Sequence, residues 1–328
     1  MANFAIVGAT GVVGQKMIKR LEESALPVEN LYLLASHRSA GKTMLFRGKE
    51  YVVEELTEQS FNRPIDYALF SAGGKTSLHY APIAEQNGVI VIDNSSAWRM
   101  DDSIDLIVPE CNVPSLQRKI IANPNCSTIQ SVVPLKPLHD AFGLKRVAYT
   151  TYQAVSGSGQ AGINDLINGA KGEAPTNYPH PIYNNVLPHI DVFNDEGYTK
   201  EELKMILETK KILSLSDDVK ITATCVRVPI LNSHSVAINV TFNKPTTVDE
   251  IRAILKNAPG VILVDNPQNN EYPMPIHAND RDEVLVGRIR VDHSLENTFH
   301  IWCVGDNIRK GAASNTVQIA ELLEQLKQ

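Results

Sequence analysis

A glycine-rich segment near the N-terminus constrains the fold more than any other feature of the sequence. Residues 8–14 read Gly-Ala-Thr-Gly-Val-Val-Gly, directly after the apolar segment Asn3–Val7 and at the start of the helical pattern Val12–Ser24. A strand, a glycine-rich turn and a helix in this order open a βαβ unit, in which a pyrophosphate can approach the backbone at the helix N-terminus. A glycine-rich turn that binds no nucleotide is the alternative.

Two kinds of strand follow along the chain. Short apolar segments alternate with helical patterns in the first third, which is typical of a parallel sheet. These strands are Asn30–Ala35, Tyr67–Ser71, Val89–Asp93, Leu106–Val108 and Ile120–Ala122. Later segments are longer and partly alternating, which indicates a mixed or antiparallel sheet with one covered face. They are Lys145–Gln153, Lys220–Pro229, Ser235–Phe242, Val284–Asp292 and Thr298–Gly305.

Helical and loop patterns complete the expected secondary structure. Helices are predicted over Gly74–Asn87, Thr199–Lys211 and Thr247–Asn257, the last with a capping box at its start. The C-terminal segment Lys310–Gln328 is amphipathic, and its apolar stripe consists of Val317, Ala320, Leu323 and Leu326. The Pro- and Asn-rich segment Pro175–Pro188 is expected to be a surface loop that reaches a partner subunit.

Length, charge and cysteine spacing exclude several classes of protein. At about 100–200 residues per domain, 328 residues predict two domains. A net charge of -6 argues against nucleic-acid binding, which draws on a basic surface. The 4 cysteines are far apart and form no zinc-site spacing, so no metal is expected. Without a basic leader or an apolar run of about 18 residues, we expect a cytoplasmic protein that does not enter a membrane.

The end of the second expected strand bears on the choice of nicotinamide cofactor. An enzyme that uses NAD usually carries an acid there to bind the ribose 2′-hydroxyl. Residues 36–42 contain no acid, whereas Arg38 and Ser39 suit a 2′-phosphate. This pattern favours NADP, and a solvated basic loop is the alternative.

Cys126 is the strongest candidate for a nucleophile. It follows Asn123-Pro124-Asn125 and precedes the apolar helical pattern Ile129–Leu138. A helix N-terminus stabilises a thiolate, although a small buried cysteine explains the position about equally well. His234 follows Arg227 near the ends of strand segments, and that spacing alone is weak support for a catalytic role.

Taken together, these residues resemble the aspartate-β-semialdehyde dehydrogenase family in its bacterial form, across essentially the whole chain. The matching segments, in order, are Gly8–Gly14, Asp93–Arg99, Asn123–Cys126, Tyr152–Gly159, Glu208–Leu213, Cys225–Val228, His234 and Gly305–Ala313. Their order and joint presence make the resemblance specific.

The resemblance implies an NADP-dependent, reversible conversion of 4-phospho-L-aspartate to L-aspartate 4-semialdehyde and phosphate, in the pathway to lysine, threonine and methionine. It implies Cys126 as the nucleophile that forms an acyl-thioester, His234 as general acid/base and Gln153 as an orienting group. The substrate ligands it implies are Arg99 and Lys211 for phosphate, Arg227 for the α-carboxylate and Glu208 for the α-ammonium, with Asn125 beside the nucleophile. The NADP contacts it implies are Gly8, Thr10, Gly11, Val12, Val13, Arg38, Ser39, Ser71, Ser156, Gly157 and Asn307.

The fold that follows is α/β, of the glyceraldehyde-3-phosphate dehydrogenase type, in a homodimer. A Rossmann-type nucleotide domain would comprise residues 1–126 and 308–328, and an α+β catalytic and dimerisation domain residues 127–307. Two other functions stay open. N-acetyl-γ-glutamyl-phosphate reductase shares the fold and the thioester chemistry, although the Glu208 and Lys211 pair argues for a free ammonium group. A non-catalytic NADP-binding sensor with Cys126 as its redox switch leaves the other charged candidates unexplained.

Overall fold

The computed structural model describes residues 1–327 and divides the chain into two compact units. The first unit contains Met1–Asn125 together with the C-terminal segment that begins at Ala312. The second unit is Cys126–Gly311. The divisions therefore fall before Cys126 and after Gly311, where the sequence predicted them after Cys126 and after Asn307.

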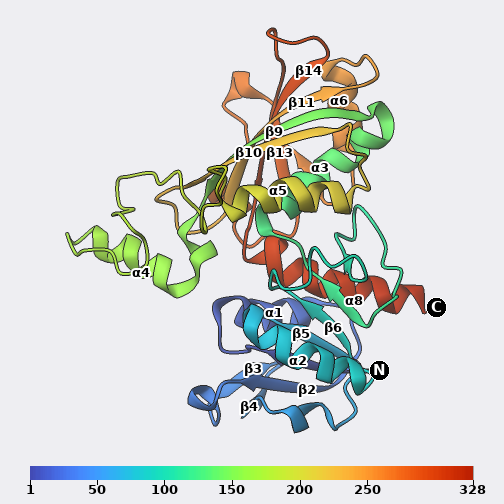
Figure 1. Cartoon of the computed structure of the whole chain (residues 1–328), viewed down its shortest axis with the longest axis vertical. Helices are drawn as coiled ribbons and strands as arrows, with labels where there is room; N and C mark the ends of the chain where they lie inside the picture. The colour runs from blue at the N-terminus through green and yellow to red at the C-terminus, as the bar shows by residue number, and fades with distance from the viewer. Residues whose placement is uncertain (328) are drawn as a thin grey trace. The chain divides into compact units, whose positions relative to one another are not determined.

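An eight-stranded sheet forms the centre of the first unit, with the order β3-β4-β2-β1-β5-β6-β8-β7 (Figure 1). Its strands are β1 (Ala2–Val7), β2 (Val28–Ala35), β3 (Thr43–Phe46), β4 (Lys49–Glu55), β5 (Tyr67–Phe70), β6 (Ile90–Asp93), β7 (Asp105–Leu106) and β8 (Ile120–Ala122). All neighbouring pairs are parallel except β3 with β4. The helices of this unit are α1 (Val12–Glu23), α2 (Gly74–Gln86) and α8 (Asn315–Leu326). The expected parallel-sheet domain is confirmed.

The β3–β4 hairpin was not predicted. Phe46 pairs with Lys49 across a two-residue turn, in which Arg47 and Gly48 both have positive φ, 49° and 75°. Two positive φ angles are typical of a type I′ hairpin turn, which usually has Asn or Asp before the glycine. Arg47 in that place hid the turn from sequence analysis.

The C-terminal helix packs within the first unit through most of its predicted stripe. Val317, Ala320 and Leu323 are buried in the same core cluster as strand β1, whereas Leu326 is 56% exposed at the helix end. The α-helix begins at Asn315 and not at Lys310, because Arg309–Ser314 forms a π-helical turn. Gln328, the last residue of the predicted helix, lies outside the described residues.

The second unit contains a six-stranded mixed sheet with the order β10-β9-β11-β14-β13-β12. Its strands are β9 (Leu144–Gln153), β10 (Lys220–Arg227), β11 (His234–Phe242), β12 (Val261–Leu263), β13 (Val284–Val291) and β14 (Thr298–Gly305). The sheet is covered by α3 (Cys126–Phe142), α5 (Lys200–Ile212) and α6 (Val248–Lys256). Because α3 contacts both α5 and α6, the three helices share one face. The mixed sheet with one covered face is confirmed.

Two short helices of the second unit were not predicted, α4 (Gly159–Gly169) and α7 (Pro275–Ala278). Figure 1 shows α4 beside the sheet, followed by the irregular segment that contains Pro175–Pro188. Three glycines within α4 lower its helix propensity and weaken its pattern. Among all helices of residues 1–327, none is long and apolar enough to cross a membrane.

Candidate functional site

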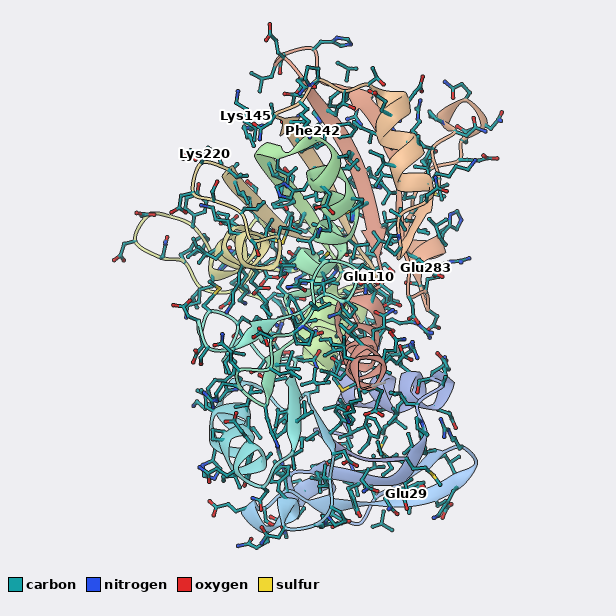
Figure 2. The ribbon with its side chains drawn as sticks, turned by 90° about the vertical axis from the view of Figure 1, so that its right-hand side faces the viewer. Glu29, Glu110, Lys145, Lys220, Phe242 and Glu283 are labelled. Carbon is teal, nitrogen blue, oxygen red and sulfur yellow. The ribbon has the colours of Figure 1, made fainter. Side chains whose placement is uncertain are left out.

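Strand register gathers three of the expected site residues at one edge of the second unit's sheet. Strands β9 and β10 are parallel and Gln153 pairs with Arg227, so both side chains lie at the ends of their strands. Strand β11 runs antiparallel to β9 and begins with His234, next to Ser235, which pairs with Tyr152. Figure 2 labels Lys145 and Lys220 near the first residues of β9 and β10, at the ends of these strands that lie away from Gln153 and Arg227. The amide, guanidinium and imidazole therefore gather from three adjacent strands.

Helix α3 places Cys126 over the same edge. Cys126 is the first residue of the helix and is partly exposed. One turn later, the Gln130 amide nitrogen donates to the His234 carbonyl at 3.0 Å, which fastens the start of α3 to the start of β11. Gly311 packs against Cys126, because a Cβ added at Gly311 would lie 2.7 Å from the Cys126 Cβ. A helix N-terminus in this position is suited to stabilising a thiolate or an oxyanion.

His234 is fully buried, and its hydrogen bonds define which ring nitrogen carries the proton. Its Nδ1 accepts from the Ala154 N–H at 2.9 Å, so a neutral ring holds its proton on Nε2. Nε2 is buried and has no partner within the described part of the chain. Burial, and then the positive charge of Arg227, lower the pKa of His234 well below its ordinary value. The resting ring is therefore neutral near pH 7, with a free N–H donor.

Ala154 also holds the arginine of this edge. The Arg227 Nη1 donates to the Ala154 carbonyl at 2.7 Å, and the side chain is only 5% exposed. A Cβ added to Gly157 would lie 3.1 Å from Arg227 Nη1 and 3.3 Å from His234 Nε2. The two polar groups thus border the same small space, which a side chain at residue 157 would fill.

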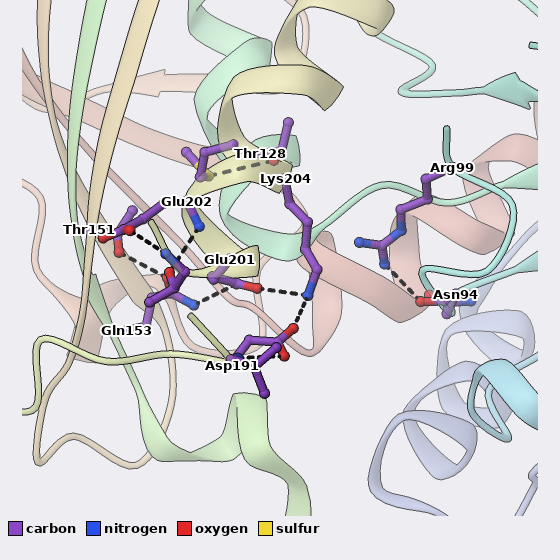
Figure 3. A network of polar contacts seen from close by, with 12 residues as sticks. Asn94, Arg99, Thr128, Thr151, Gln153, Asp191, Glu201, Glu202 and Lys204 are labelled. Atoms are coloured by element: carbon purple, nitrogen blue, oxygen red, sulfur yellow. Dashed lines mark hydrogen bonds and ion pairs between the residues drawn. The ribbon is translucent and has the colours of Figure 1, made fainter. Parts of the chain in front are cut away.

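The Gln153 amide is oriented by a buried network that sequence analysis did not find (Figure 3). Its oxygen accepts from the Thr151 hydroxyl at 2.9 Å, and its nitrogen donates to Glu201 at 3.1 Å. Lys204 then bridges Glu201 at 3.1 Å and Asp191 at 2.8 Å. Burial alone would lower the pKa of Lys204, but the two carboxylates outweigh it and raise that pKa. The predicted orienting residue is thus bonded directly to an acid, Glu201, and through it to a cation, Lys204.

Glu208 and Lys211, the candidates implied by the resemblance, occupy later turns of the same helix α5. Glu208 is 1% exposed and Lys211 is partly buried. Seven residues separate each from Glu201 and Lys204, which is about 10 Å along a helix. The two Glu-x-x-Lys pairs have the same spacing, so the sequence contains a signal for both. The structure links the earlier pair to Gln153.

In the first unit, the glycine-rich loop forms a tight backbone cradle. Gly8 has φ of 87°, and a Cβ there would lie 2.5 Å from the Ser71 carbonyl oxygen. Gly11 precedes Val12 and Val13 at the start of α1 and donates its N–H to the Gly8 carbonyl at 3.0 Å. A loop whose first position admits only glycine, opening onto a helix N-terminus, fits a dinucleotide pyrophosphate.

The expected adenosine side of this cradle contains a pair, His37 and Glu55, that was not predicted from the sequence. Thr10 donates to Ser39 at 3.2 Å, and Arg38 is exposed. However, strand pairing places Glu55 opposite Ala35, at the end of β2. Glu55 lies 3.0 Å from His37, and this hydrogen bond, followed by the charge, raises the pKa of His37. An acid is therefore present near the site, paired with a titratable cation.

Arg99 lies on the loop after β6, at the carboxyl edge of the first unit's sheet. Its Nη2 donates to the Asn94 carbonyl at 2.9 Å (Figure 3). The loop is held by Asp93, which accepts from the Ser95 hydroxyl at 2.5 Å. Burial raises the pKa of Asp93, and hydrogen bonds from Ser95 and Ser77 oppose that rise. Asn125, which ends this unit, is 6% exposed.

The remaining cofactor candidates lie in the second unit. Ser156 and Asn307 are both buried and hydrogen-bonded, with the Asn307 amide nitrogen donating to the Ser156 hydroxyl at 3.0 Å. Asn307 also accepts from the Ser233 N–H at 2.9 Å. The structure brings these two candidates together, next to Gly157.

The other three cysteines are buried. Burial raises the pKa of the Cys225 thiol, and it raises that of Cys303 to about 12, so neither is a thiolate near pH 7. Cys111 is buried in the first unit. Within residues 1–327, no group of three His, Cys, Asp or Glu side chains is arranged to hold a metal ion.

Comparison with known proteins matches both units to one family. Residues 3–119 match the semialdehyde dehydrogenase NAD-binding domain, and residues 135–310 match the semialdehyde dehydrogenase dimerisation domain. An aspartate-semialdehyde dehydrogenase of Aquifex aeolicus is 56% identical over 97% of both chains. That of Bacillus subtilis is 46% identical over 98% of this chain and 97% of the relative.

Solved structures agree with this assignment. Aspartate semialdehyde dehydrogenase II from Vibrio cholerae, complexed with ASA, superimposes with a TM-score of 0.95 at 44% identity and covers 99% of this chain and 98% of that one. The aspartate semialdehyde dehydrogenase of Candida albicans with NADP gives 0.80 at 26% identity, over 99% and 98% of the two chains. The chain, an oxidoreductase with a Rossmann nucleotide-binding domain, belongs to the aspartate-semialdehyde dehydrogenase family.

Proposed function

We propose that the protein catalyses the reversible, NADP-dependent reductive dephosphorylation of 4-phospho-L-aspartate to L-aspartate 4-semialdehyde. One observation carries the proposal. Cys126 opens α3 above the sheet edge where an amide, a guanidinium and an imidazole meet. This arrangement supplies a nucleophile, an anion ligand and a proton donor for acyl transfer.

In the biosynthetic direction, the Cys126 thiolate attacks the acyl phosphate carbonyl. The carbon–sulfur bond forms as the carbon–oxygen bond to phosphate breaks, which leaves an aspartyl thioester on Cys126. The N–H groups at the start of α3 stabilise the oxyanion of this step. Bound NADPH supplies the hydride that reduces an acyl group to an aldehyde.

His234 acts on the reacting oxygen as a neutral donor. Its proton lies on Nε2, because Nδ1 is occupied by the Ala154 N–H. This arrangement supports the donor half of the acid/base role that we expected from the sequence. To accept a proton at Nδ1, the ring must first break its hydrogen bond to the Ala154 N–H. In the resting protein, His234 therefore acts as a hydrogen-bond donor through Nε2.

Substrate recognition follows from charge. Arg227 would bind the α-carboxylate, because it is buried, borders the His234 space and keeps further N–H groups besides the one bound to Ala154. Arg99 would bind phosphate. For the α-ammonium and the second phosphate cation we propose Glu201 and Lys204, since their network includes Gln153. Glu208 and Lys211, implied by the resemblance, are the alternatives.

Paired substitutions on α5 decide whether Glu201 with Lys204 or Glu208 with Lys211 binds the substrate. Glu201→Gln should raise the KM for the semialdehyde about tenfold or more, the cost of losing a buried charge-assisted hydrogen bond. Glu208→Gln, on the same helix, should leave that KM within about twofold. The reverse result would return the ammonium site to Glu208.

The cofactor proposal is NADP, bound by the glycine-rich cradle of the first unit. Gly8, Gly11, Val12 and Val13 would take the pyrophosphate, and Arg38, Ser39 and Thr10 the 2′-phosphate. Ser71 lies directly beside Gly8 and would line the same cradle. Ser156, Gly157 and Asn307 of the second unit remain candidates for the nicotinamide side.

We also propose a homodimer, formed through the uncovered face of the six-stranded sheet. The dimerisation-domain match supports it, and so does a pair of aromatic rings on that face, Tyr152 and Trp302, 5.4 Å apart and partly exposed. Light scattering should give twice the mass of the chain, and Trp302→Glu should shift the protein toward the monomer.

The test of the whole proposal is NADPH formation at 340 nm with aspartate semialdehyde and phosphate, roughly where a reduced nicotinamide absorbs. N-acetylglutamate semialdehyde is the parallel substrate. Activity with the first and not the second supports the proposal, whereas the reverse would identify an N-acetyl-γ-glutamyl-phosphate reductase. If neither is oxidised while NADP binds, the protein is a sensor and the proposal is wrong.

A further inference from the structure

Tyr178 belongs to the Pro-rich loop after α4, a segment to which the proposed reaction gives no role. Its ring faces the Arg227 guanidinium, with the Arg227 Cζ 5.9 Å from the ring centroid. Its hydroxyl donates to the Ser158 hydroxyl at 2.9 Å and also lies 3.5 Å from the Val155 carbonyl oxygen, a second and weaker acceptor for the same proton. One side chain therefore contacts both Arg227 and the 3-10 turn Val155–Ser158.

That turn borders the space in front of Arg227 and His234. Gly157 lies within it, and a Cβ at residue 157 would lie 3.1 Å from Arg227 Nη1 and 3.3 Å from His234 Nε2. A side chain at residue 157 would therefore press on both groups, so the position of this turn sets the size of the space in front of them. By bonding to Ser158 and Val155, Tyr178 holds the wall of the space as well as the guanidinium.

The Tyr178 loop is itself fixed by α4. Asp165 accepts from the N–H groups of Thr176, Asn177 and Tyr178 at 2.8 to 2.9 Å, and from the Thr176 hydroxyl at 2.9 Å. Burial opposes ionisation, but these hydrogen bonds outweigh it and lower the pKa of Asp165. On α4, Gly162 leaves room for the ring, because a Cβ there would lie 2.6 Å from the Tyr178 hydroxyl.

The same loop also holds the Arg227 backbone. Leu187 and Arg227 exchange both main-chain hydrogen bonds, at 2.9 and 2.8 Å. Arg227 is thus fixed at its backbone by Leu187, at Nη1 by the Ala154 carbonyl and on one face by Tyr178. A flexible side chain held at three points loses little further entropy when it binds a carboxylate.

We propose that Tyr178 is a positioning residue that holds Arg227 in the orientation for a substrate carboxylate, so that the loop after α4 serves substrate recognition. The inference rests on the proposed role of Arg227. It differs from the sequence-based expectation, in which this loop reaches a partner subunit.

The test compares three variants by two-substrate kinetics in the intact protein. Tyr178→Leu should raise the KM for aspartate semialdehyde about tenfold, as expected when a partly desolvated cation loses an aromatic face. The kcat and the KM values for phosphate and NADP should stay within about twofold, which a general loss of structure would not allow. Tyr178→Phe keeps the ring and should restore the KM to within about threefold of the wild type. Tyr183→Leu, on the same loop and half-exposed, is the matched control and should have no effect.

Arg227→Leu and the double variant separate failure of the inference from failure of the proposed function. If Arg227→Leu leaves the KM for the semialdehyde unchanged, the role of Arg227 is wrong and the inference falls with it. If Arg227→Leu raises that KM and Tyr178→Leu raises it further by the same factor, the two residues act independently and the inference alone is overturned. No further rise in the double variant supports it. Should Tyr178→Leu not fold, Tyr178→Met takes the same measurements with the same outcomes.

Discussion

The loop Gly8–Gly14 of the first unit presents backbone groups, whereas the sheet edge of the second unit presents the side chains of Gln153, Arg227 and His234. The shape of the loop depends on Gly8, at which a Cβ would lie 2.5 Å from the Ser71 carbonyl oxygen, and on Gly14, at which a Cβ would lie 2.2 Å from the Gly8 carbonyl oxygen. The edge needs Ala154, Glu201 and Tyr178 to orient its polar groups. In the first unit, substitutions should therefore impair function when they fall within the loop. In the second unit, substitutions at the supporting residues should impair function as well.

Loss of the nucleophile should have the largest effect. We expect Cys126→Ser to lower kcat by about a thousandfold or more while NADP still binds, because a helix N-terminus stabilises a thiolate far better than an alkoxide. Steady-state kinetics and a fluorescence titration with NADP measure the two properties. Cys111→Ser is the control and should keep its activity. Near-wild-type turnover in Cys126→Ser would show that another group attacks the substrate.

Removal of the two candidate anion ligands should affect different substrates. Each substitution should raise one KM about a hundredfold, because a lost ionic hydrogen bond in a desolvated site costs about 2–3 kcal/mol. Arg227→Leu should chiefly raise the KM for the semialdehyde, and Arg99→Leu the KM for phosphate. A two-substrate kinetic matrix on both variants gives the answer. Equal increases in both KM values for both variants would contradict separate anion sites.

A methyl group in the glycine cradle should weaken cofactor binding and stability. Gly8→Ala places a Cβ 2.5 Å from the Ser71 carbonyl oxygen. We expect this clash to lower the free energy of unfolding by about 1–3 kcal/mol and to weaken NADP binding. Gly41→Ala is the matched control, because Gly41 has nearly the same φ, 85° against 87°, with no heavy atom of the described structure within 4 Å of its Cβ position. Thermal unfolding and NADP titration compare the two. If both variants lose NADP affinity equally, close approach to Ser71 is not the cause.

The pH dependence of kcat should report the charge next to His234. Its pKa is lowered by burial and by Arg227, so the neutral, active ring persists below pH 6.5, and activity falls only as the pH drops through that lowered pKa. Arg227→Leu removes a positive charge, which should raise the pKa and move the acid limb to higher pH. Arg99→Leu should not move it, because burial and the Arg227 charge are the causes of the shift. An acid limb that stays in place in Arg227→Leu would remove His234 as its source.

The smallest effect should be on cofactor choice. Arg38 is exposed, so its loss should lower the ratio of kcat/KM for NADP to that for NAD by about fivefold. Glu55→Gln should raise the same ratio, because an acid beside the β2 end disfavours a 2′-phosphate. Kinetics with both cofactors at low salt measure it. Unchanged ratios would place the 2′-phosphate elsewhere.

The comparison also explains what could be predicted from the sequence. The glycine loop, α1 and the N-terminal position of Cys126 are local features, and their patterns identified them. Glu201 and Lys204 have the same spacing as Glu208 and Lys211, and only the packing of α5 decides which turn meets Gln153. Glu55 lies near Arg38 because β2 pairs with β4, and β4 belongs to a hairpin with an atypical turn residue. These contacts are non-local, so no pattern along the chain contains them.

The central claim, that Cys126 carries an acyl group at the edge of the second unit's sheet, can be tested by mass spectrometry. The protein is mixed with aspartate semialdehyde and NADP without phosphate, quenched in acid and digested. We predict a mass increase of one aspartyl group on the peptide that contains Cys126, its disappearance when phosphate is added before quenching, and its absence in Cys126→Ser. An aspartyl group on any other cysteine, or none while NADPH is formed, would contradict the account.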